Sequence, residues 1–489
     1  MHDVILPLLL LLTGAFLSAL LGRIRPALSY PVGVLALVLA VFYSLSTLFG
    51  VLHSGPVTYL LGGWAPPWGI AFEVDELSAA MMVLISLSSL IAFVTFRDEI
   101  LANTAEKTAA FVTLSMLTVA GHIGIVATGD LFNLYVLIEV SALSGYALLG
   151  FGARRTLLSS LNYLCIGSVG ASFYLLGVGY LYMVTGSLNI ADIYTLFQTS
   201  ELSMSLRAAV AVIMLGLWVK MALFPFHGWL PGAYAYGSTA ASALLAPLTT
   251  KVMIYVMVRL LLDVFPADSL IPSAIPNIAV PLATAAILVG SLMAFRQKNQ
   301  RKMICYILVA EIGYMVGGIF IGNRAAMTGA VLHIFADSLM TLTIFLAMGN
   351  IISRQGSSDM TKMKGLFKTM PFTMACFVLG AMSMIGVPPF FGFFSKWQLL
   401  TGAMQAGHYV FMVGLILSSL VNVVLFFRLF ETAFFEKPDE PEAATTCQCE
   451  RWYRVMPLAV AASLLVLAGL SSGLIIDKII ARIIPITII

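Results

Sequence analysis

The chain has 489 residues, of which 60% are hydrophobic and only 10% are charged, and its formal net charge is +3. Ordinary soluble domains carry about 25% charged residues. This composition therefore excludes a soluble enzyme, a nucleic-acid-binding protein and a disordered protein. Because one membrane span needs about 20 apolar residues, the sequence predicts an all-α integral membrane protein with many spans.

Apolar runs separated by polar breaks predict about 14 transmembrane helices. The first run is predicted to be a retained helix rather than a cleaved signal peptide, because His2 and Asp3 stand where a signal peptide has basic residues. The predicted spans are 4–22, 32–52, 77–96, 108–127, 131–150, 161–185, 208–230, 240–262, 278–295, 304–322, 325–351, 372–400, 408–430 and 456–476.

Basic residues in the loops predict the orientation. The loops after odd-numbered spans hold 18 Lys and Arg residues, and the loops on the opposite side hold 5. Cytoplasmic loops carry the excess of Lys and Arg, so we expect a multi-pass protein of the cell (plasma or inner) membrane with both termini on the non-cytoplasmic side. The other three basic residues, Lys220, Lys251 and Lys396, lie inside hydrophobic spans.

Seven ionisable residues are predicted to lie at one depth, near the centre of the bilayer. Each costs at least about 2.5–3.5 kcal/mol on insertion scales, so their presence needs a reason. Their signs alternate across successive helices, which indicates a lateral polar axis. The seven residues are Glu139, Lys220, Lys251, Glu311, His333, Asp337 and Lys396.

The alternative is that these residues form structural ion pairs between helices, and for Glu139 and Lys220 this remains open. Lys251 and Lys396 have no obvious acidic partner on their own helices, which weakens the structural alternative for them. A desolvated lysine releases its proton more readily, and a nearby carboxylate reverses this effect. The distance between Glu and Lys would therefore control proton release.

Two spans are predicted to be broken helices. Residues 207–236 and 371–402 are too long for one straight crossing, and prolines interrupt them. Broken helices at corresponding places, running in opposite directions, predict two inverted five-helix repeats, spans 4–8 and 9–13. The predicted units are residues 1–107, 108–262, 278–430 and 431–489. The predicted breaks lie at Pro225, Pro231, Pro388 and Pro389.

The stretch WVKMALFPFHGWLPGAY, residues 218–234, resembles the proton-translocating antiporter-like subunits of respiratory complex I, membrane-bound NiFe hydrogenases and Mrp cation/proton antiporters. Further similar stretches are NLYVLIEVSALSGY, SALLAPLTTKVMIYVMVR, FEVDELSAAM and PPFFGFFSKW, so the resemblance covers roughly residues 70–430. It implies partners in a multisubunit membrane complex, with protons and also Na⁺ as candidate transported ions.

The resemblance also implies a role for each matching residue. Glu139 modulates the helix 7 lysine Lys220, Lys251 is the connecting residue on helix 8, His333 follows on helix 11, and Lys396 is the terminal residue on helix 12. A lysine at position 396, where one complex I subunit type has glutamate, favours an Mrp D-type relative.

Three residues depart from the family pattern, so the central relay is expected to use carboxylates or water in place of a lysine. Glu311 replaces a neutral residue or histidine, Asp337 replaces a frequent second histidine, and Thr341 stands where many relatives have lysine. His227, in the break of span 7, either relays protons or ends the helix by hydrogen bonding. His333 and Asp337 are a minority candidate for a Na⁺ or divalent metal site, and Cys447-x-Cys449 lacks a second ligand pair.

No nucleotide loop, flavin motif or iron–sulfur cysteine set is present, so no cofactor is expected and any redox chemistry belongs to other subunits. Three hypotheses remain. The leading one is a proton-conducting subunit of an Mrp-type antiporter or of a related hydrogenase or respiratory complex. The second is a proton-pumping subunit of a complex I-type NADH-quinone oxidoreductase. The third is the membrane subunit of an inorganic-carbon uptake system.

Overall fold

The computed structural model describes residues 2–151, 154–199, 204–265, 274–436 and 450–484. Twelve helices in this part of the chain are long and apolar enough to cross a membrane. Two interrupted crossings, α9 with α10 and α17 with α18, complete the predicted set of about 14. The division into four units and the internal repeat symmetry stay predictions.

The described residues form the following helices and strands. The elements that make up the crossings are α1 (Leu6–Ile24), α2 (Ser29–Ser54), α3 (Glu76–Thr95), α5 (Ala105–Ala127), α6 (Leu131–Leu149), α7 (Arg154–Thr185), α9 (Met204–Lys220), α10 (Trp229–Tyr236), α11 (Thr239–Leu245), α12 (Thr249–Arg259), α13 (Ala274–Phe295), α14 (Gln300–Ile321), α15 (Arg324–Gln355), α17 (Pro371–Ile385), α18 (Phe391–Gln405), α19 (Tyr409–Phe435) and α20 (Trp452–Leu470). Shorter elements are β1 (Val57–Leu60), β2 (Ala71–Val74), α4 (Arg97–Leu101), α8 (Ile190–Thr199), α16 (Leu366–Thr369), α21 (Ser472–Ile475) and α22 (Ala481–Ile483).

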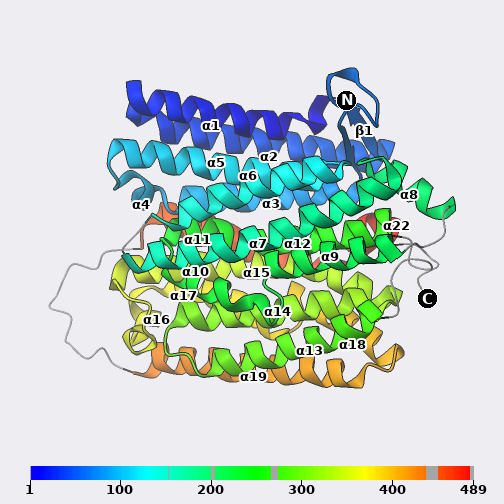
Figure 1. Ribbon diagram of the computed structural model, residues 1–489. Helices are drawn as coiled ribbons and strands as arrows, with labels where there is room; N and C mark the ends of the chain where they lie inside the picture. The colour runs from blue at the N-terminus through cyan, green and yellow to red at the C-terminus, as the bar shows by residue number, and fades with distance from the viewer. Residues whose placement is uncertain (1, 152–153, 200–203, 266–273, 437–449, 485–489) are drawn as a thin grey trace.

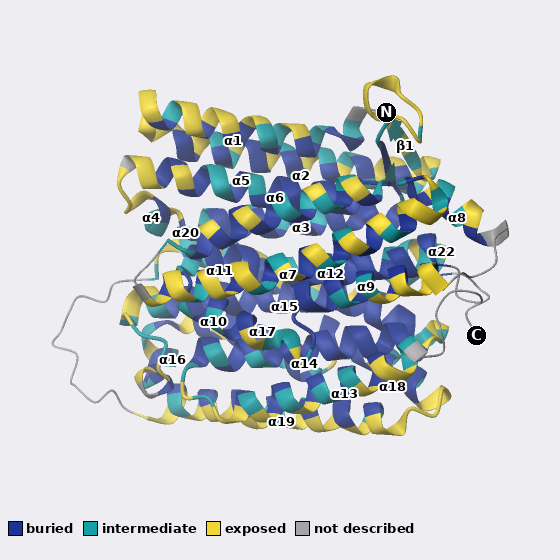
Figure 2. Cartoon of the chain, in the orientation of Figure 1, coloured by how far each residue is buried: buried dark blue, intermediate teal, exposed yellow. Residues whose placement is uncertain are grey.

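The crossings lie side by side, with α1 and α2 at one edge of the bundle and α13 and α19 at the other (Figure 1). The centre of the bundle is α15, whose most apolar stretch is entirely buried, and α14 beside it is nearly so. Peripheral helices expose many leucines and phenylalanines, as expected for surfaces that meet lipid or other subunits (Figure 2). The midplane residues on α14 and α15 are therefore shielded from lipid on all sides.

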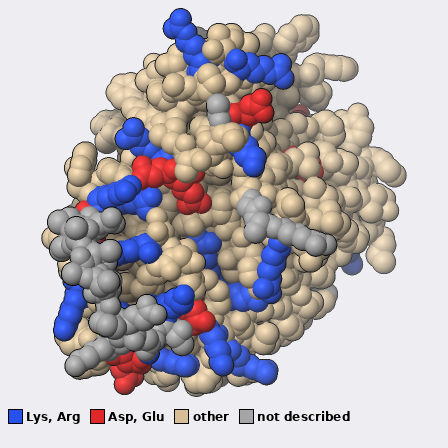
Figure 3. Space-filling model, turned by 90° about the vertical axis from the view of Figure 1, so that its left-hand side faces the viewer, with Lys and Arg blue, Asp and Glu red and all other residues tan. Residues whose placement is uncertain are grey.

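The two ends of the bundle differ in charge. Lys and Arg side chains gather on the end that carries α4, α10 and α16 (Figure 3). The hairpin β1–β2, the first turn at His2–Val4 and α22 lie at the opposite end (Figure 1). Trp64, Trp68 and Trp452 are largely exposed, as expected for side chains that anchor a protein at the membrane interface.

Both predicted broken helices are interrupted, and each first half ends in the same way. In α9, the Leu223 N–H donates to the Trp218 carbonyl, and Ala222 has a left-handed φ of 61°. In α17, the Val387 N–H donates to the Met382 carbonyl, and Gly386 has a φ of 94°. Both are Schellman endings, and Pro225 and Pro388 follow them, where a helix cannot continue.

The structure corrects two details of this prediction. Pro231 does not interrupt the helix, because it lies in the first turn of α10, where the missing N–H of proline costs no hydrogen bond. Span 8, predicted as one helix, is interrupted as well: α11 ends at Leu245 and α12 begins at Thr249. Pro247 in this gap lacks the N–H that a continuous helix needs.

Candidate functional site

The first pair of midplane charges joins α6 to α9. Lys220 is the last residue of α9, and its Nζ lies 2.9 Å from Oε1 of Glu139. The lysine side chain is 6% exposed and the glutamate side chain 22%. The carboxylate and the negative end of the α9 dipole both favour an ammonium group at this position.

The second pair joins α12 to α15 in the fully buried interior. Lys251 Nζ lies 2.9 Å from Oδ2 of Asp337, and both side chains are completely buried. This oxygen accepts no hydrogen bond with good geometry from the described residues, so the contact is an ion pair. The lysine also donates to the Ala246 carbonyl at 3.3 Å, while the Thr341 hydroxyl donates to Asp337 Oδ1 at 2.9 Å.

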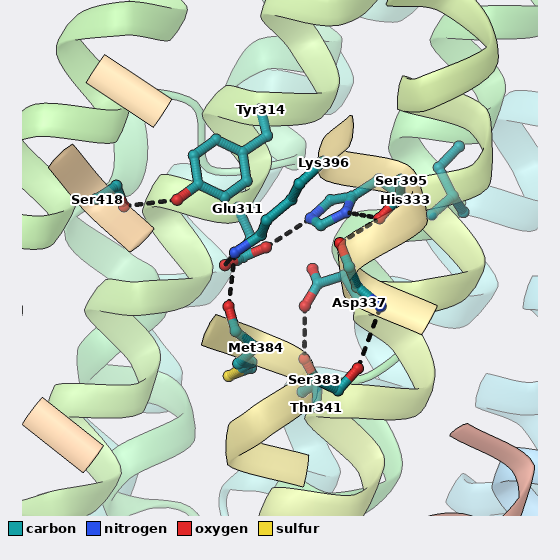
Figure 4. Close-up of polar contacts among 12 residues, drawn as sticks. Glu311, Tyr314, His333, Asp337, Thr341, Ser383, Met384, Ser395, Lys396 and Ser418 are labelled. Carbon is teal, nitrogen blue, oxygen red and sulfur yellow. Dashed lines mark hydrogen bonds and ion pairs between the residues drawn. The ribbon is translucent and has the colours of Figure 1, made fainter. Parts of the chain in front are cut away.

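The third cluster joins α14, α15 and α18 (Figure 4). Glu311 is completely buried; its Oε2 lies 2.5 Å from Nε2 of His333, and its Oε1 lies 3.4 Å from Nζ of Lys396. The other ring nitrogen of His333 lies 2.8 Å from the Ser395 hydroxyl. One carboxylate therefore bridges an imidazole and an ammonium group, so a proton on either base would be stabilised by the same negative charge.

All three lysines lie at, or contact, the C-terminal end of an interrupted helix. Lys220 ends α9, Lys251 donates to the carbonyl beyond the end of α11, and Lys396 donates to the Met384 carbonyl of α17 at 2.6 Å. A helix break frees backbone carbonyls, and non-helical backbone at membrane depth is tolerated where it lines a polar site. The breaks after α11 and α17 thus each supply a carbonyl acceptor for one buried ammonium group, while Lys220 has Glu139 as its acceptor.

Helix α15 connects the second pair to the third cluster. His333 and Asp337 are four residues apart, so they project from one face on successive turns. Among the described residues, no hydrogen bond or ion pair joins Lys220 directly to Lys251. The ring of Tyr146 lies beside the first pair, with its centroid 6.0 Å from Lys220 Nζ.

Comparison with known proteins places this arrangement in a family. A family model described as NADH:quinone oxidoreductase/Mrp antiporter, transmembrane, matches residues 128–421. The chain belongs to this family. The match contains all seven midplane ionisable residues, and it confirms the resemblance of residues 218–234.

Individual relatives come from both branches of the family. The N subunit of the NADH-quinone oxidoreductase of Desulforudis audaxviator is 40% identical, covering 94% of this chain and 93% of its own. The D subunit of the Na(+)/H(+) antiporter of Alkalihalophilus pseudofirmus is 30% identical over 90% of this chain and 88% of its own. The corresponding antiporter protein of Bacillus subtilis is 28% identical over 89% and 88%.

Solved structures share the fold over the whole chain. A chain of the Mrp complex from Dietzia sp. superimposes with a TM-score of 0.87 at 24% identity, covering 100% of this chain and 98% of its own. A chain of an archaeal membrane-bound sulfane sulfur reductase gives 0.88 at 26% identity, covering 99% and 97%. A chain of complex I from Thermus thermophilus gives 0.77 at 22%, covering 96% and 98%.

The structure brings all seven midplane residues into the two interhelical pairs and the third cluster described above. Lys251 and Lys396 do have acidic partners, but on other helices, which the sequence could not show. His227 lies in the break as predicted, stacked on Phe224 at 5.5 Å. Its Nδ1 has no hydrogen-bond partner among the described residues, so it does not close the helix end through that atom.

Two further histidines lie outside the three clusters. His122 is buried, and His408 is exposed beside the start of α19. In the described residues, no group of three or more His, Cys, Asp or Glu side chains is arranged to hold a metal ion, including around His333 and Asp337. Cys447 and Cys449 lie outside the described residues.

Some polar partners of the site were not predicted. Ser395, next to Lys396 in sequence, contacts His333, and the Tyr314 ring lies 5.0 Å from Lys396 Nζ. Tyr314 in turn donates to the Ser418 hydroxyl at 2.6 Å. Spacing alone could have suggested Tyr314, because it lies one turn from Glu311 on α14.

Gly392 in the α17–α18 break provides a test of this geometry. A Cβ at this position would lie 2.0 Å from the Ser383 carbonyl oxygen and 3.0 Å from Met340 Sδ. We expect Gly392→Ala to displace the start of α18, and with it Lys396, and to lower the thermal melting temperature of the assembled complex. The matched control is Gly228→Ala, because a Cβ at this position meets nothing within 4 Å. This variant should melt like the wild type. Gly407 is not a suitable control, because its left-handed φ of 75° would strain an alanine.

Proposed function

We propose that this chain is a proton-conducting, antiporter-like subunit of a multisubunit cation/proton antiporter or of a related respiratory complex. The observation that carries this proposal is the series of three buried lysines, each paired with a carboxylate from another helix. Buried ion pairs are weak evidence for stability, because desolvation offsets much of their attraction. Three of them at the breaks of three helices indicate function, since intramembrane ionisable groups typically mark ion pathways.

The proposed path follows the order of the clusters. A change in the separation of Glu139 and Lys220 controls whether Lys220 holds its proton. The proton then passes to the Lys251–Asp337 pair, and from there through His333 and Glu311 to Lys396. The freed carbonyls at the α17–α18 break stabilise the charged form of Lys396 before release. Thr341 orients Asp337 in this scheme, and Ser395 orients His333.

The exposure of Glu139 supports a neighbouring membrane subunit on the α6 face. Its carboxylate is 22% exposed at the middle of α6, on the same face as the exposed Phe132, Val136 and Leu143. A carboxylate facing lipid at this depth is costly. We infer that another subunit of the complex covers this face, in keeping with the Mrp and respiratory complexes that contain the structural relatives.

Two kinds of complex remain as candidates. Similarity to the D subunits of antiporters supports the cation/proton antiporter, whereas the 40% identity to the N subunit of an NADH-quinone oxidoreductase supports the complex I-type alternative. The genes beside this one separate these candidates and the inorganic-carbon system. Small Mrp-type subunits, a NiFe-type large subunit or a carbonic-anhydrase-like partner would each identify the complex.

The proposed orientation places both ends of the chain outside the cytoplasm. The basic end of the bundle would then face the cytoplasm (Figure 3). Cysteine labelling of intact cells checks this assignment: a cysteine at exposed Thr58 on β1 should react with an impermeant reagent. A cysteine at exposed Lys298 should react only after the membrane is opened.

The experiment that tests proton transfer at the centre is Lys251→Arg in the assembled complex. Arginine keeps the positive charge beside Asp337 but does not release a proton in proteins, so transport in vesicles should fall by about 100-fold, the lower end of the range for removing an acid–base group. Thermal stability, measured in parallel, separates this effect from misfolding of the packed site. Wild-type transport in Lys251→Arg would show that deprotonation of residue 251 is not required.

A further inference from the structure

A second polar cluster lies at the C-terminal end of α12, outside the midplane site. Lys251, Tyr255 and Arg259 are spaced four residues apart, so they form one stripe along this helix. The stripe leads from the buried Lys251–Asp337 pair towards the hairpin end of the bundle (Figure 1). Arg259 lies about 12 Å from Lys251 along the helix axis, at 1.5 Å per residue.

All three guanidinium nitrogen atoms of Arg259 make polar contacts. It forms ion pairs with Asp75 and with Asp263, the latter at 3.0 Å. It also donates to the Tyr255 hydroxyl at 2.9 Å and to the Ser78 hydroxyl at 2.7 Å. Since Asp75 caps the start of α3 by accepting from the Ser78 N–H, the guanidinium is fixed to two elements at once.

Tyr255 is equally constrained. Its hydroxyl accepts from Arg259, donates to the Val126 carbonyl at 2.9 Å and lies 2.7 Å from the Ser78 hydroxyl. The Ser78 hydroxyl accepts from Arg259, so its own hydrogen is available to Tyr255. The hydrogens of both hydroxyls are therefore engaged, and Tyr255 has no acceptor position left over, so neither hydroxyl has a free hydrogen to pass inwards.

A cavity of about 260 Å³ lies on the other side of this network. Glu73, Asp75, Asp263 and Thr128 line it, and Tyr255 and Arg259 form part of its wall. Burial, followed by the nearby charge of Asp263, raises the pKa of Glu73 in β2. This acidic cavity would attract cations from the hairpin end, and one helical turn beyond its Tyr255 wall lies Lys251.

We infer that Arg259 is an electrostatic barrier that stops protons and other cations in this acidic cavity from reaching the Lys251–Asp337 pair. This inference rests on the proposed function. An arginine stays protonated at any physiological pH, so it repels cations and cannot relay protons. A fixed arginine in a narrow polar passage is a known physical means of excluding protons and cations. The barrier would prevent protons from leaking between the central relay and the hairpin end of the bundle.

Passive proton leak through the assembled complex tests this inference. The complex is reconstituted in vesicles that contain a pH-sensitive dye, and the decay of an imposed pH gradient is measured without any driving reaction. Arg259→Gln should speed the decay by at least about tenfold, because the positive charge is lost. Arg259→Lys places an ammonium group beside Asp75 and Asp263, whose negative charges favour its protonated form, so it should stay as tight as the wild type although it loses most of the hydrogen bonds. Arg482→Gln removes an ion pair with Glu76 at the same end and should not leak.

Each outcome decides the matter. A tight Arg259→Gln complex overturns the inference, and equal leak from Arg259→Gln and Arg259→Lys shows that bonding, rather than charge, seals the passage. If Arg259→Gln does not assemble, the double variant Arg259→Gln/Asp75→Asn removes both charges of one pair, which avoids an unpaired buried carboxylate, and the same leak is expected. Driven transport by Lys251→Arg is a separate measurement, so failure of the barrier leaves the proposed relay standing.

Discussion

Lys220→Ala should reduce proton-coupled transport by the assembled complex about 100-fold or more, as expected when a proton-transferring group is removed. Lys220 ends α9 at the helix break and contacts Glu139 at 2.9 Å, so alanine removes the only charged group of α9 at this depth. Glu139→Gln should also impair transport severely, because Lys220 then lacks the charge that controls its proton. Transport is measured as the pH change inside vesicles that contain the purified complex.

Two results separate a relay from a structural pair here. Removing Lys220 leaves one carboxylate, Glu139, without its partner, whereas removing Glu311 leaves both His333 and Lys396 without theirs. We therefore expect Lys220→Ala complexes to assemble and to lose less melting temperature than Glu311→Gln complexes. Lys298→Ala, at an exposed loop position, is the matched control and should transport normally. Unchanged transport by Lys220→Ala would contradict the relay.

Glu311→Gln should have the second large effect, on both transport and stability. Glutamine keeps the shape of the side chain, but Lys396 and His333 lose the one carboxylate that they share. Breaking a buried ion pair by removing one partner typically costs about 3–5 kcal/mol. We expect a clear drop in melting temperature, loss of transport at neutral pH and a shifted pH profile for the transport that remains.

The same substitution at Glu76 provides the control. Glu76 pairs with Arg482 at 2.8 Å, but that arginine is 41% exposed and the pair lies at the end of the bundle. Glu76 itself is buried, but its substitution leaves only a partly exposed guanidinium without a partner, so Glu76→Gln should lower the melting temperature far less than Glu311→Gln and should transport almost normally. If Glu311→Gln lowered stability while transport per assembled complex stayed intact, Glu311 would be a structural neutraliser of Lys396, and His333 would have to supply its proton by another route.

Much of this arrangement could be predicted because membrane insertion makes charges conspicuous in a sequence. Glu139, Lys220 and Lys396 stand out by their positions inside apolar runs, and Pro225 and Pro388 mark real breaks. The break between α11 and α12, before Thr249, was not predicted because a single proline inside a long apolar run also occurs in continuous, kinked helices. Pro231 was wrongly predicted to be a break. A proline interrupts a helix only in its interior, and Pro231 lies in the first turn of a new helix.

Partner assignment was the part that sequence could not supply. Asp337 lies on α15 and Lys251 on α12, and only the packing of these helices makes them a pair. The backbone acceptors at Ala246 and Met384 are equally hidden, because every residue has a carbonyl and only the local fold decides which ones are free. The bridging of His333 and Lys396 by Glu311 likewise depends on three helices meeting at one level.

The pairing has a consequence for how many protons the layer can hold. Three ammonium groups face three carboxylates, so with a neutral His333 the layer carries no excess charge. One further proton on His333 makes the interior positive, and in a medium of low dielectric constant that charge is felt by Lys251 and Lys396 on either side. A second proton that entered before the first had left would be repelled by this positive charge. The layer is thus suited to carry protons singly, with each departure restoring electrical neutrality for the next.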